Sequence, residues 1–147
     1  HHLESMRKVK LFVDGAHTAE SMQTTTEWFS QEVHVPKTTD EQTIVVFIFS
    51  CTHDRNPETL LRPVVDLHLR SSPGLFQHVI FSPVSLDATE SASSKQVAWA
   101  ESWSSLLAGN PSPSADPTIV GSVSESLERV QEIAAQNPTK NVEVLVT

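Results

Sequence analysis

Short apolar runs alternate along this chain with stretches in which apolar residues recur at helical spacing. The most apolar run is 43–49 (TIVVFIF), where nearly every residue is β-branched or aromatic. Such a run is typical of a strand covered on both faces, which favours a parallel sheet between helices. Shorter runs at 10–13, 76–81, 118–120 and 142–146 predict four further strands.

Four helices are predicted between these strands, because apolar residues recur there every three or four positions. Trp28 lies beside the first stripe, so we expect it to be only partly buried. The four stripes are Met22, Thr26, Phe29 and Val33; Leu60, Leu61, Val64, Val65 and His68; Val97, Trp99, Trp103 and Leu106; and Leu127, Val130, Ile133 and Ala134.

Capping residues mark where these helices begin. Thr18 is placed to cap the first helix, and Asn56, followed by a proline, the second. Ser122 and Glu125 have the spacing of a capping box ahead of the last helix. Pro63 lies inside the second helical stripe and predicts that this helix ends or kinks early.

The regular strand–helix alternation, with short connections, implies right-handed crossovers and a mainly parallel sheet. The predicted fold is a single three-layer α/β domain of Rossmann-like type, with about five to six strands. Residues 1–6 (HHLESM) are interpreted as a purification-tag remnant, which leaves 7–147 as the domain.

Composition excludes several classes of protein. The chain has 147 residues and a formal net charge of −8, which argues against a nucleic-acid-binding surface. No stretch approaches the roughly 18 apolar residues of a membrane span. The single cysteine, Cys51, excludes an internal disulfide framework and fits a reducing compartment. It follows the most apolar strand, so we expect it to be buried, and a reactive thiol is a minor alternative.

Polar residues cluster at the ends of the first two predicted strands, at 14–17 (DGAH) and 52–55 (THDR). Because consecutive strands of such sheets are usually neighbours, we expect the two clusters to face one crevice. A carboxylate at Asp14 suits a ribose hydroxyl or the orientation of His17, and the amides of the following helix start suit an anion.

Two other interpretations of these clusters remain open. Asp14 and Asp54 are common turn residues, so both carboxylates would then only satisfy turn amides. Alternatively, the same two acids form a site for zinc or another divalent metal with His17 and His53, although no compact HxxxH or HxH motif is present. The remaining histidines carry no partner signal and are expected to be structural or solvated: His34, His68 and His78.

Motifs for several chemistries are missing from the sequence. There is no GxSxG for a nucleophilic serine, and Ser82-Pro83 stands where a phospho-receiver domain needs an acid. None of the four glycines belongs to a P-loop or to GxGxxG: Gly15, Gly74, Gly109 and Gly121. If the chain handles ATP, it therefore does so together with another domain.

Four segments resemble one family. The stretch 12–22 (FVDGAHTAESM) is similar to the DGAHT-type motif that opens the C-terminal domain of folylpolyglutamate synthases, which belong to the Mur ligase superfamily. Trp28-Phe29 matches the WF pair that follows the motif. The stretch 54–57 (DRNP) resembles the family's DRDP, with Asn56 in place of the acid, and 144–147 (VLVT) resembles the start of its VLVTGSLxLVG ending.

The resemblance implies an ATP-dependent ligase. ATP phosphorylates the terminal carboxylate of tetrahydrofolate, and the amine of L-glutamate attacks the acyl phosphate to form a γ-linked amide. An N-terminal domain would supply the P-loop and most Mg²⁺ ligands. By their place in the motif, Asp14 and His17 are expected on the ATP side of the cleft, and Arg55 is expected to face glutamate or phosphate. This chain alone is then expected to be inactive.

The resemblance also implies that the domain packs on its own N-terminal ATPase domain, in the cytoplasm or in mitochondria. Dihydrofolate synthase activity stays open within the family. Outside it, the alternatives are a metal-dependent hydrolase and a non-catalytic α/β binding module.

Overall fold

A computed structural model describes residues 9–15, 18–32, 43–50, 56–70, 75–83, 94–108 and 117–147. Its five strands form one fully parallel sheet in the order β1-β5-β2-β3-β4. The strands are β1 (Val9–Val13), β2 (Thr43–Phe49), β3 (His78–Phe81), β4 (Pro117–Ile119) and β5 (Asn141–Val146). The helices are α2 (Ala19–Glu32), α3 (Pro57–Arg70), α4 (Ser94–Leu107) and α5 (Val123–Gln136). The predicted α/β Rossmann-like class is confirmed.

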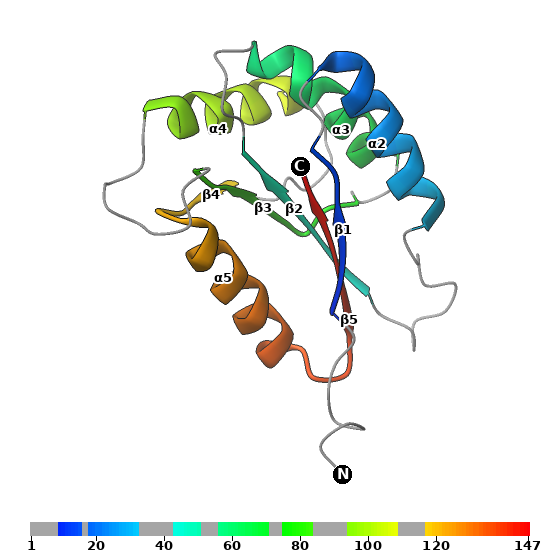
Figure 1. The fold of residues 1–147 in the computed structure, drawn as a ribbon, viewed down its shortest axis with the longest axis vertical. Coiled ribbons are helices and arrows are strands. Elements are labelled where there is room, and N and C mark those ends of the chain that lie inside the picture. Colours follow the sequence, from blue (N-terminus) through cyan, green and yellow to red (C-terminus); the bar gives the residue numbers. More distant parts are fainter. Residues whose placement is uncertain are drawn as a thin grey trace.

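The direction of each crossover decides which face of the sheet a helix covers. From β1 through β2 and β3 to β4 the chain moves across the sheet in one direction, so right-handed crossovers place α2, α3 and α4 on the same face. The step from β4 back to β5 runs in the opposite direction and places α5 on the other face. Figure 1 shows this three-layer arrangement, with three helices gathered on one side and α5 on the other.

The last strand of the chain lies in the interior of the sheet. β5 pairs with β1 over Val9–Val13 and with β2 over Thr43–Ile48. The first two strands are therefore not neighbours, and the prediction that they would be is wrong. The reason is that β5, which is remote in the sequence, inserts between them.

The face under α2, α3 and α4 (the α2 face) is rich in aromatic side chains. Phe47 lies at its centre, with ring centroids 5.5 Å from Phe76 and 5.9 Å from Trp103. Phe12 packs edge-on against Phe29 at 5.1 Å. Such edge-to-face and tilted contacts add to the hydrophobic burial of the rings, so this face is held by one continuous ring cluster.

The opposite face (the α5 face) is aliphatic. Val130, Ile133 and Ala134 of α5 pack on branched residues of β2, β3 and β5, namely Ile44, Val46, Ile48, Ile80, Val142 and Val144. β1 contributes three residues to the same face, because Val9, Leu11 and Val13 are in register with Val142, Val144 and Val146. These three residues, here called the β1 stripe, remain exposed.

The predicted strand at 43–49 is buried at every position, as expected for a strand covered on both faces. The strand predicted from residue 76 begins at His78 instead. Its neighbour Gln77 makes the contacts a longer strand would make, since its N–H donates to the Val45 carbonyl (2.9 Å) and its side-chain oxygen accepts from the Val45 N–H (2.6 Å).

All three predicted N-caps are confirmed. The Ser21 N–H donates to Thr18 Oγ1 (3.0 Å), and the Glu58 N–H donates to Asn56 Oδ1 (3.0 Å). The Glu125 N–H donates to Ser122 Oγ (3.0 Å), while the Glu125 carboxylate accepts the Gly121 N–H. These bonds satisfy amide donors that lack a partner in the first helical turn.

Pro63 does not end its helix early. α3 continues through it to Arg70, and the proline ring is buried. The ring lies on the apolar side of α3 among residues such as Val64, so packing offsets the hydrogen bond that proline cannot donate.

Two predicted core positions are wrong. Val97 and Leu127 are each 42% exposed, whereas Gln96 and Ser126 are buried in their helices. Gln96 is buried because its amide donates to the carbonyls of Phe81 (3.0 Å) and Val120 (2.7 Å). In α4 the buried row is therefore Gln96, Trp99, Trp103 and Leu107, with Leu106 half-buried; Val33, expected in the first stripe, lies outside the described residues.

Candidate functional site

Three strands end side by side at the carboxyl edge of the sheet. The Asp14 N–H donates to the Val146 carbonyl (2.9 Å), and the Ser50 N–H donates to the Thr147 carbonyl (3.2 Å). Thr147 in turn donates its N–H to the carbonyl of Ile48 (3.0 Å). Asp14, Thr147 and Ser50 thus form a row across the ends of β1, β5 and β2, where open α/β sheets bind ligands.

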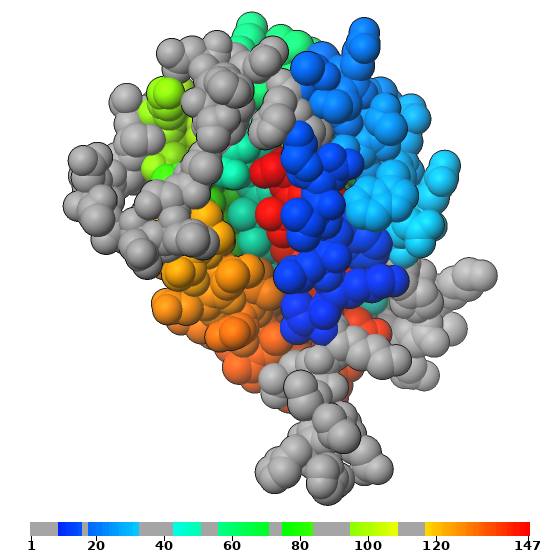
Figure 2. Space-filling view, viewed as in Figure 1, coloured from blue at the N-terminus to red at the C-terminus, as the bar shows by residue number. Residues whose placement is uncertain are grey.

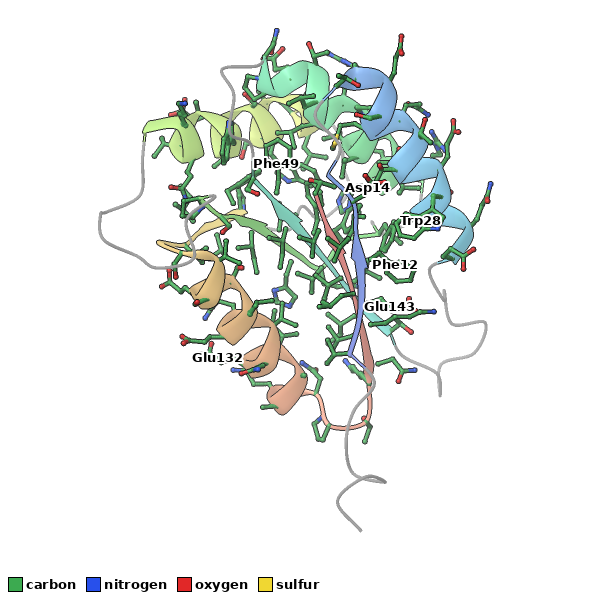
Figure 3. The ribbon with its side chains drawn as sticks, in the orientation of Figure 1. Phe12, Asp14, Trp28, Phe49, Glu132 and Glu143 are labelled. Atoms are coloured by element: carbon green, nitrogen blue, oxygen red, sulfur yellow. The ribbon has the colours of Figure 1, made fainter. Side chains whose placement is uncertain are left out.

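Asp14 is anchored to helix α2. Its Oδ2 accepts a hydrogen bond of 2.9 Å from the hydroxyl of Thr25, whose side chain is only 2% exposed. Asp14 itself is exposed, and Figure 3 shows it at the end of β1 beside α2. The partner of this carboxylate is a buried side chain rather than a turn amide. One oxygen is therefore fixed by α2, and Oδ1 is the oxygen that a ligand would meet.

Thr147 brings a hydroxyl next to this carboxylate. Asp14 and Thr147 directly follow Val13 and Val146, which are in register. Side chains alternate along a strand, so both residues point to the α2 face, as Phe12 and Leu145 do. Thr147 Oγ1 is buried and makes no hydrogen bond within the described part of the chain.

Two helices begin at the same edge. The N-terminus of a helix carries a partial positive charge that favours an anion. However, Glu20 and Glu58 lie in the first turns of α2 and α3 and already place a carboxylate there. An acceptor-only carboxylate such as Asp14 suits a hydroxyl donor, for example on a ribose, better than it suits a phosphate.

Of the residues predicted for the site, the structure describes Asp14 alone. His17 and Arg55 lie outside the described residues, and so do His53, Asp54 and Cys51. The two strand ends that carry these clusters are two strands apart, about 10 Å at the usual strand spacing. The first cluster therefore has the end of β5, not the second cluster, as its immediate neighbour.

Sequence reasoning missed two residues of this edge, Thr25 and Thr147. Thr25 follows the cap residue Thr18 by seven positions, two turns along the same side of the helix. The spacing indicates that Thr25 lies on the same side of the helix as Thr18, but nothing in the run of three threonines singles out Thr25 as a partner of Asp14. Thr147 had no signal of its own, because only the sheet order shows that β5 ends beside Asp14.

The metal hypothesis is not tested by the geometry. Within the residues that the structure describes, no three His, Cys, Asp or Glu side chains converge on one point. Of the four proposed metal ligands, Asp14 lies among those residues, and His17, His53 and Asp54 lie outside them. In the same described ranges, no helix has the length and apolarity needed to cross a membrane.

Two histidines, His68 and His78, lie among the described residues. His68 is fully buried, and its Nδ1 accepts the N–H of Phe76 (3.0 Å), so the neutral ring carries its proton on Nε2. Burial lowers the pKa of His68. Burial and, to a lesser degree, the nearby Arg129 lower the pKa of His78 on the α5 face.

The fold and this edge define a Rossmann-like α/β domain that presents polar groups at the carboxyl ends of β1, β5 and β2. One stretch of 56 residues, 38% of the chain, is 39% identical to a Caenorhabditis elegans protein described as "Putative folylpolyglutamate synthase". The stretch covers 11% of that relative. No protein-family model matches the chain, and no solved structure matches it. The partial match gives weak support to the family that the DGAHT motif resembles.

Proposed function

We propose that this chain is the C-terminal domain of a folylpolyglutamate synthase, an ATP-dependent ligase that adds L-glutamate to tetrahydrofolate through a γ-linkage. The 39% match to the Caenorhabditis elegans protein supports the family. The observation that carries the proposal is the position of Asp14. The acid of the DGAHT string stands exposed at the carboxyl edge, with one oxygen held by the buried Thr25.

The proposal divides the chemistry between two domains. ATP and Mg²⁺ would be held mainly by an N-terminal P-loop domain on which this domain packs, since the chain has no P-loop motif of its own. This chain would supply Asp14, whose Oδ1 fits a ribose hydroxyl, and His17 on the ATP side. Arg55 would face glutamate or the phosphate, because a guanidinium pairs well with both.

The test is an assay of the full-length parent protein. ATP-dependent addition of labelled glutamate to tetrahydrofolate is measured for the wild type, Asp14→Ala and His17→Ala. Asp66→Ala is the matched control, because it removes an exposed carboxylate nine residues into α3, about 14 Å along the helix from its start. Dihydropteroate as acceptor, assayed in parallel, reports dihydrofolate synthase activity.

A loss of more than about tenfold, roughly 1.4 kcal/mol, in folded Asp14→Ala and His17→Ala but not in Asp66→Ala supports both the reaction and the site. An inactive wild type contradicts the ligase and directs attention to metal binding by Asp14, His17, His53 and Asp54. An active wild type with unaffected variants keeps the ligase but leaves Asp14 with only its anchoring bond to Thr25.

The 147-residue chain is expected to be inactive alone. The same assay on the isolated chain should show no ATP-dependent incorporation of glutamate above a blank without protein. Incorporation that depends on this chain would contradict the division of chemistry between two domains.

A further inference from the structure

The three consecutive threonines of α2 use their hydroxyl groups differently. Thr24 and Thr26 donate to backbone carbonyls of their own helix, over 2.9 to 3.1 Å. This is the usual choice for a threonine inside a helix. Thr25 is the exception, because its hydroxyl donates outward to Asp14 Oδ2 (2.9 Å). A hydroxyl has a single hydrogen to donate, so the donor of Thr25 is committed to this carboxylate.

The bond from Thr25 distinguishes the two oxygens of Asp14. The χ2 torsion of an aspartate is broad and roughly two-fold, so a free carboxylate exchanges its oxygens easily. Thr25 is only 2% exposed and its β-branched side chain is stiff at χ1, so the donor itself moves little. The bond therefore keeps Oδ2 turned toward α2 and leaves Oδ1 facing outward from the exposed Asp14.

A second contact fixes the position of α2 on β1. Trp28 lies three residues after Thr25, on the same side of the helix, and packs edge-on against Phe12 with ring centroids 5.5 Å apart. Phe12 precedes Asp14 by two residues and points to the same face of the sheet. Figure 3 shows Trp28 beside Phe12, with Asp14 further along β1, and Figure 2 shows β1 and α2 side by side on the surface. The place of Thr25 relative to Asp14 is thus held by the packing of the whole helix.

A carboxylate held in this way discriminates between ligands. Oδ1 can only accept a hydrogen bond, so it favours a hydroxyl over a ligand that lacks one at that point. A site built to bond a hydroxyl rejects the analogue without it, because the polar group of the protein is then left unpaired. A carboxylate free to rotate would discriminate less, since it must be ordered when the ligand binds.

We propose that Thr25 is a positioning residue that makes this site selective for ribose over deoxyribose. Thr25 holds Asp14 Oδ2, so that Oδ1 accepts a hydroxyl of the ribose of ATP. Thr25 acts through Asp14 and does not touch the nucleotide itself. The inference rests on the proposed function, in which Asp14 meets the ribose.

The test measures nucleotide selectivity in the full-length parent. Glutamate addition is assayed with ATP, 2′-deoxy-ATP and 3′-deoxy-ATP, and the selectivity is the ratio of kcat/KM for ATP to that for each analogue. Thr25→Val keeps the shape of the side chain and removes the hydroxyl, whereas Thr25→Ser keeps the hydroxyl. Thr26→Val is the matched control, because Thr26 is the next residue, is 3% exposed and donates its hydroxyl within α2.

The wild type should prefer ATP to at least one deoxy analogue by about tenfold or more. Thr25→Val should abolish most of this selectivity through a higher KM for ATP, with kcat within about twofold of wild type, because uniform binding is lost. Thr25→Ser should restore the selectivity, and Thr26→Val should leave it unchanged. A merely structural loss would lower kcat/KM for all three nucleotides alike.

Three results overturn the proposal while leaving the ligase in place: an active wild type without selectivity, a selectivity that Thr25→Val leaves intact, and an equal loss in Thr26→Val. An inactive wild type overturns the proposed function, and this inference with it. Circular dichroism shows whether each variant folds. If Thr25→Val does not fold, Thr25→Ala removes the same hydroxyl and the same outcomes apply.

Discussion

The two faces of the sheet are built differently. The α2 face is covered by three helices over interlocking aromatic rings, whereas the α5 face is covered by one helix over branched aliphatic side chains. The asymmetry follows from topology, since three crossovers run one way and one runs back. The α2 face therefore spreads its stability over many contacts, and the α5 face depends on how well one helix is formed and seated.

The largest effect is expected from removing a ring of the α2 face. Trp103 is fully buried against Phe47 and His68, so Trp103→Ala should lower the free energy of unfolding by about 3–5 kcal/mol. Ile133→Ala is the counterpart on the α5 face and should cost less, because a smaller side chain is lost. Urea unfolding followed by circular dichroism gives both values. An equal or larger loss for Ile133→Ala would mean that the ring cluster is not the stronger half of the core.

A smaller loss is expected when an apolar residue replaces a buried polar residue of α4. Gln96→Leu keeps the volume of the side chain but leaves the Phe81 and Val120 carbonyls without this donor, at a cost of about 1–3 kcal/mol. Gln131→Leu, at an exposed position of α5, makes the same chemical change and should stay within about 0.5 kcal/mol of wild type. Equal midpoints in urea for the two variants would show that water replaces the bonds of Gln96.

Gln96 also shows the limit of pattern reasoning on this fold. Apolar runs located the described strands and periodic apolar stripes located the described helices, although the early end expected for α3 at Pro63 was wrong. The same rule put Val97 in the core and Gln96 outside, since it counts apolar residues and does not recognise a buried amide that bridges two carbonyls.

The candidate site was less predictable than the fold. The strand-end rule placed Asp14 at the carboxyl edge correctly. It could not show that Thr147 would be the neighbour of Asp14, because strand order depends on pairing between residues more than 130 positions apart. Nor could it show the bond from Thr25, which depends on how α2 is rotated against the sheet.

The single helix of the α5 face should respond to the loss of its cap. Ser122→Ala removes the acceptor of the Glu125 N–H and should cost about 1 kcal/mol, and Ser122→Asp should restore most of it. Ser104→Ala, at an exposed position within α4, is the control and should be neutral or slightly stabilising. Thermal unfolding measures the three variants. An unchanged midpoint for Ser122→Ala would mean that seating on the sheet alone determines whether α5 forms.

The smallest effect at neutral pH is expected in the pH dependence of the free energy of unfolding. Folding lowers the pKa of both histidines from their ordinary value of 6.5. Below that pH the unfolded chain therefore binds more protons than the folded chain does. Stability is therefore fully present above about pH 6.5 and falls as the pH drops below it. His68, fully buried on the α2 face, should contribute more of this loss than the half-buried His78 on the α5 face.

Unfolding free energies measured between pH 5 and 7 test this comparison. His68→Gln, which keeps an acceptor but does not titrate, should flatten the slope more than His78→Gln does. A larger reduction of the slope in His78→Gln than in His68→Gln would show that the charge of Arg129 beside His78 outweighs the deeper burial of His68.

The interior position of β5 has a consequence for synthesis on the ribosome. Until the last residues of the domain leave the exit tunnel, β1 and β2 have no common partner, and a gap one strand wide separates them. Such remote pairing slows folding, because the ends of a long chain segment must meet before any contact rewards them. β3 can pair with only one edge of β2, so the other edge stays unpaired from the synthesis of residues 43–49 until β5 emerges. Chaperone binding to this edge during synthesis is therefore an expected consequence of the topology.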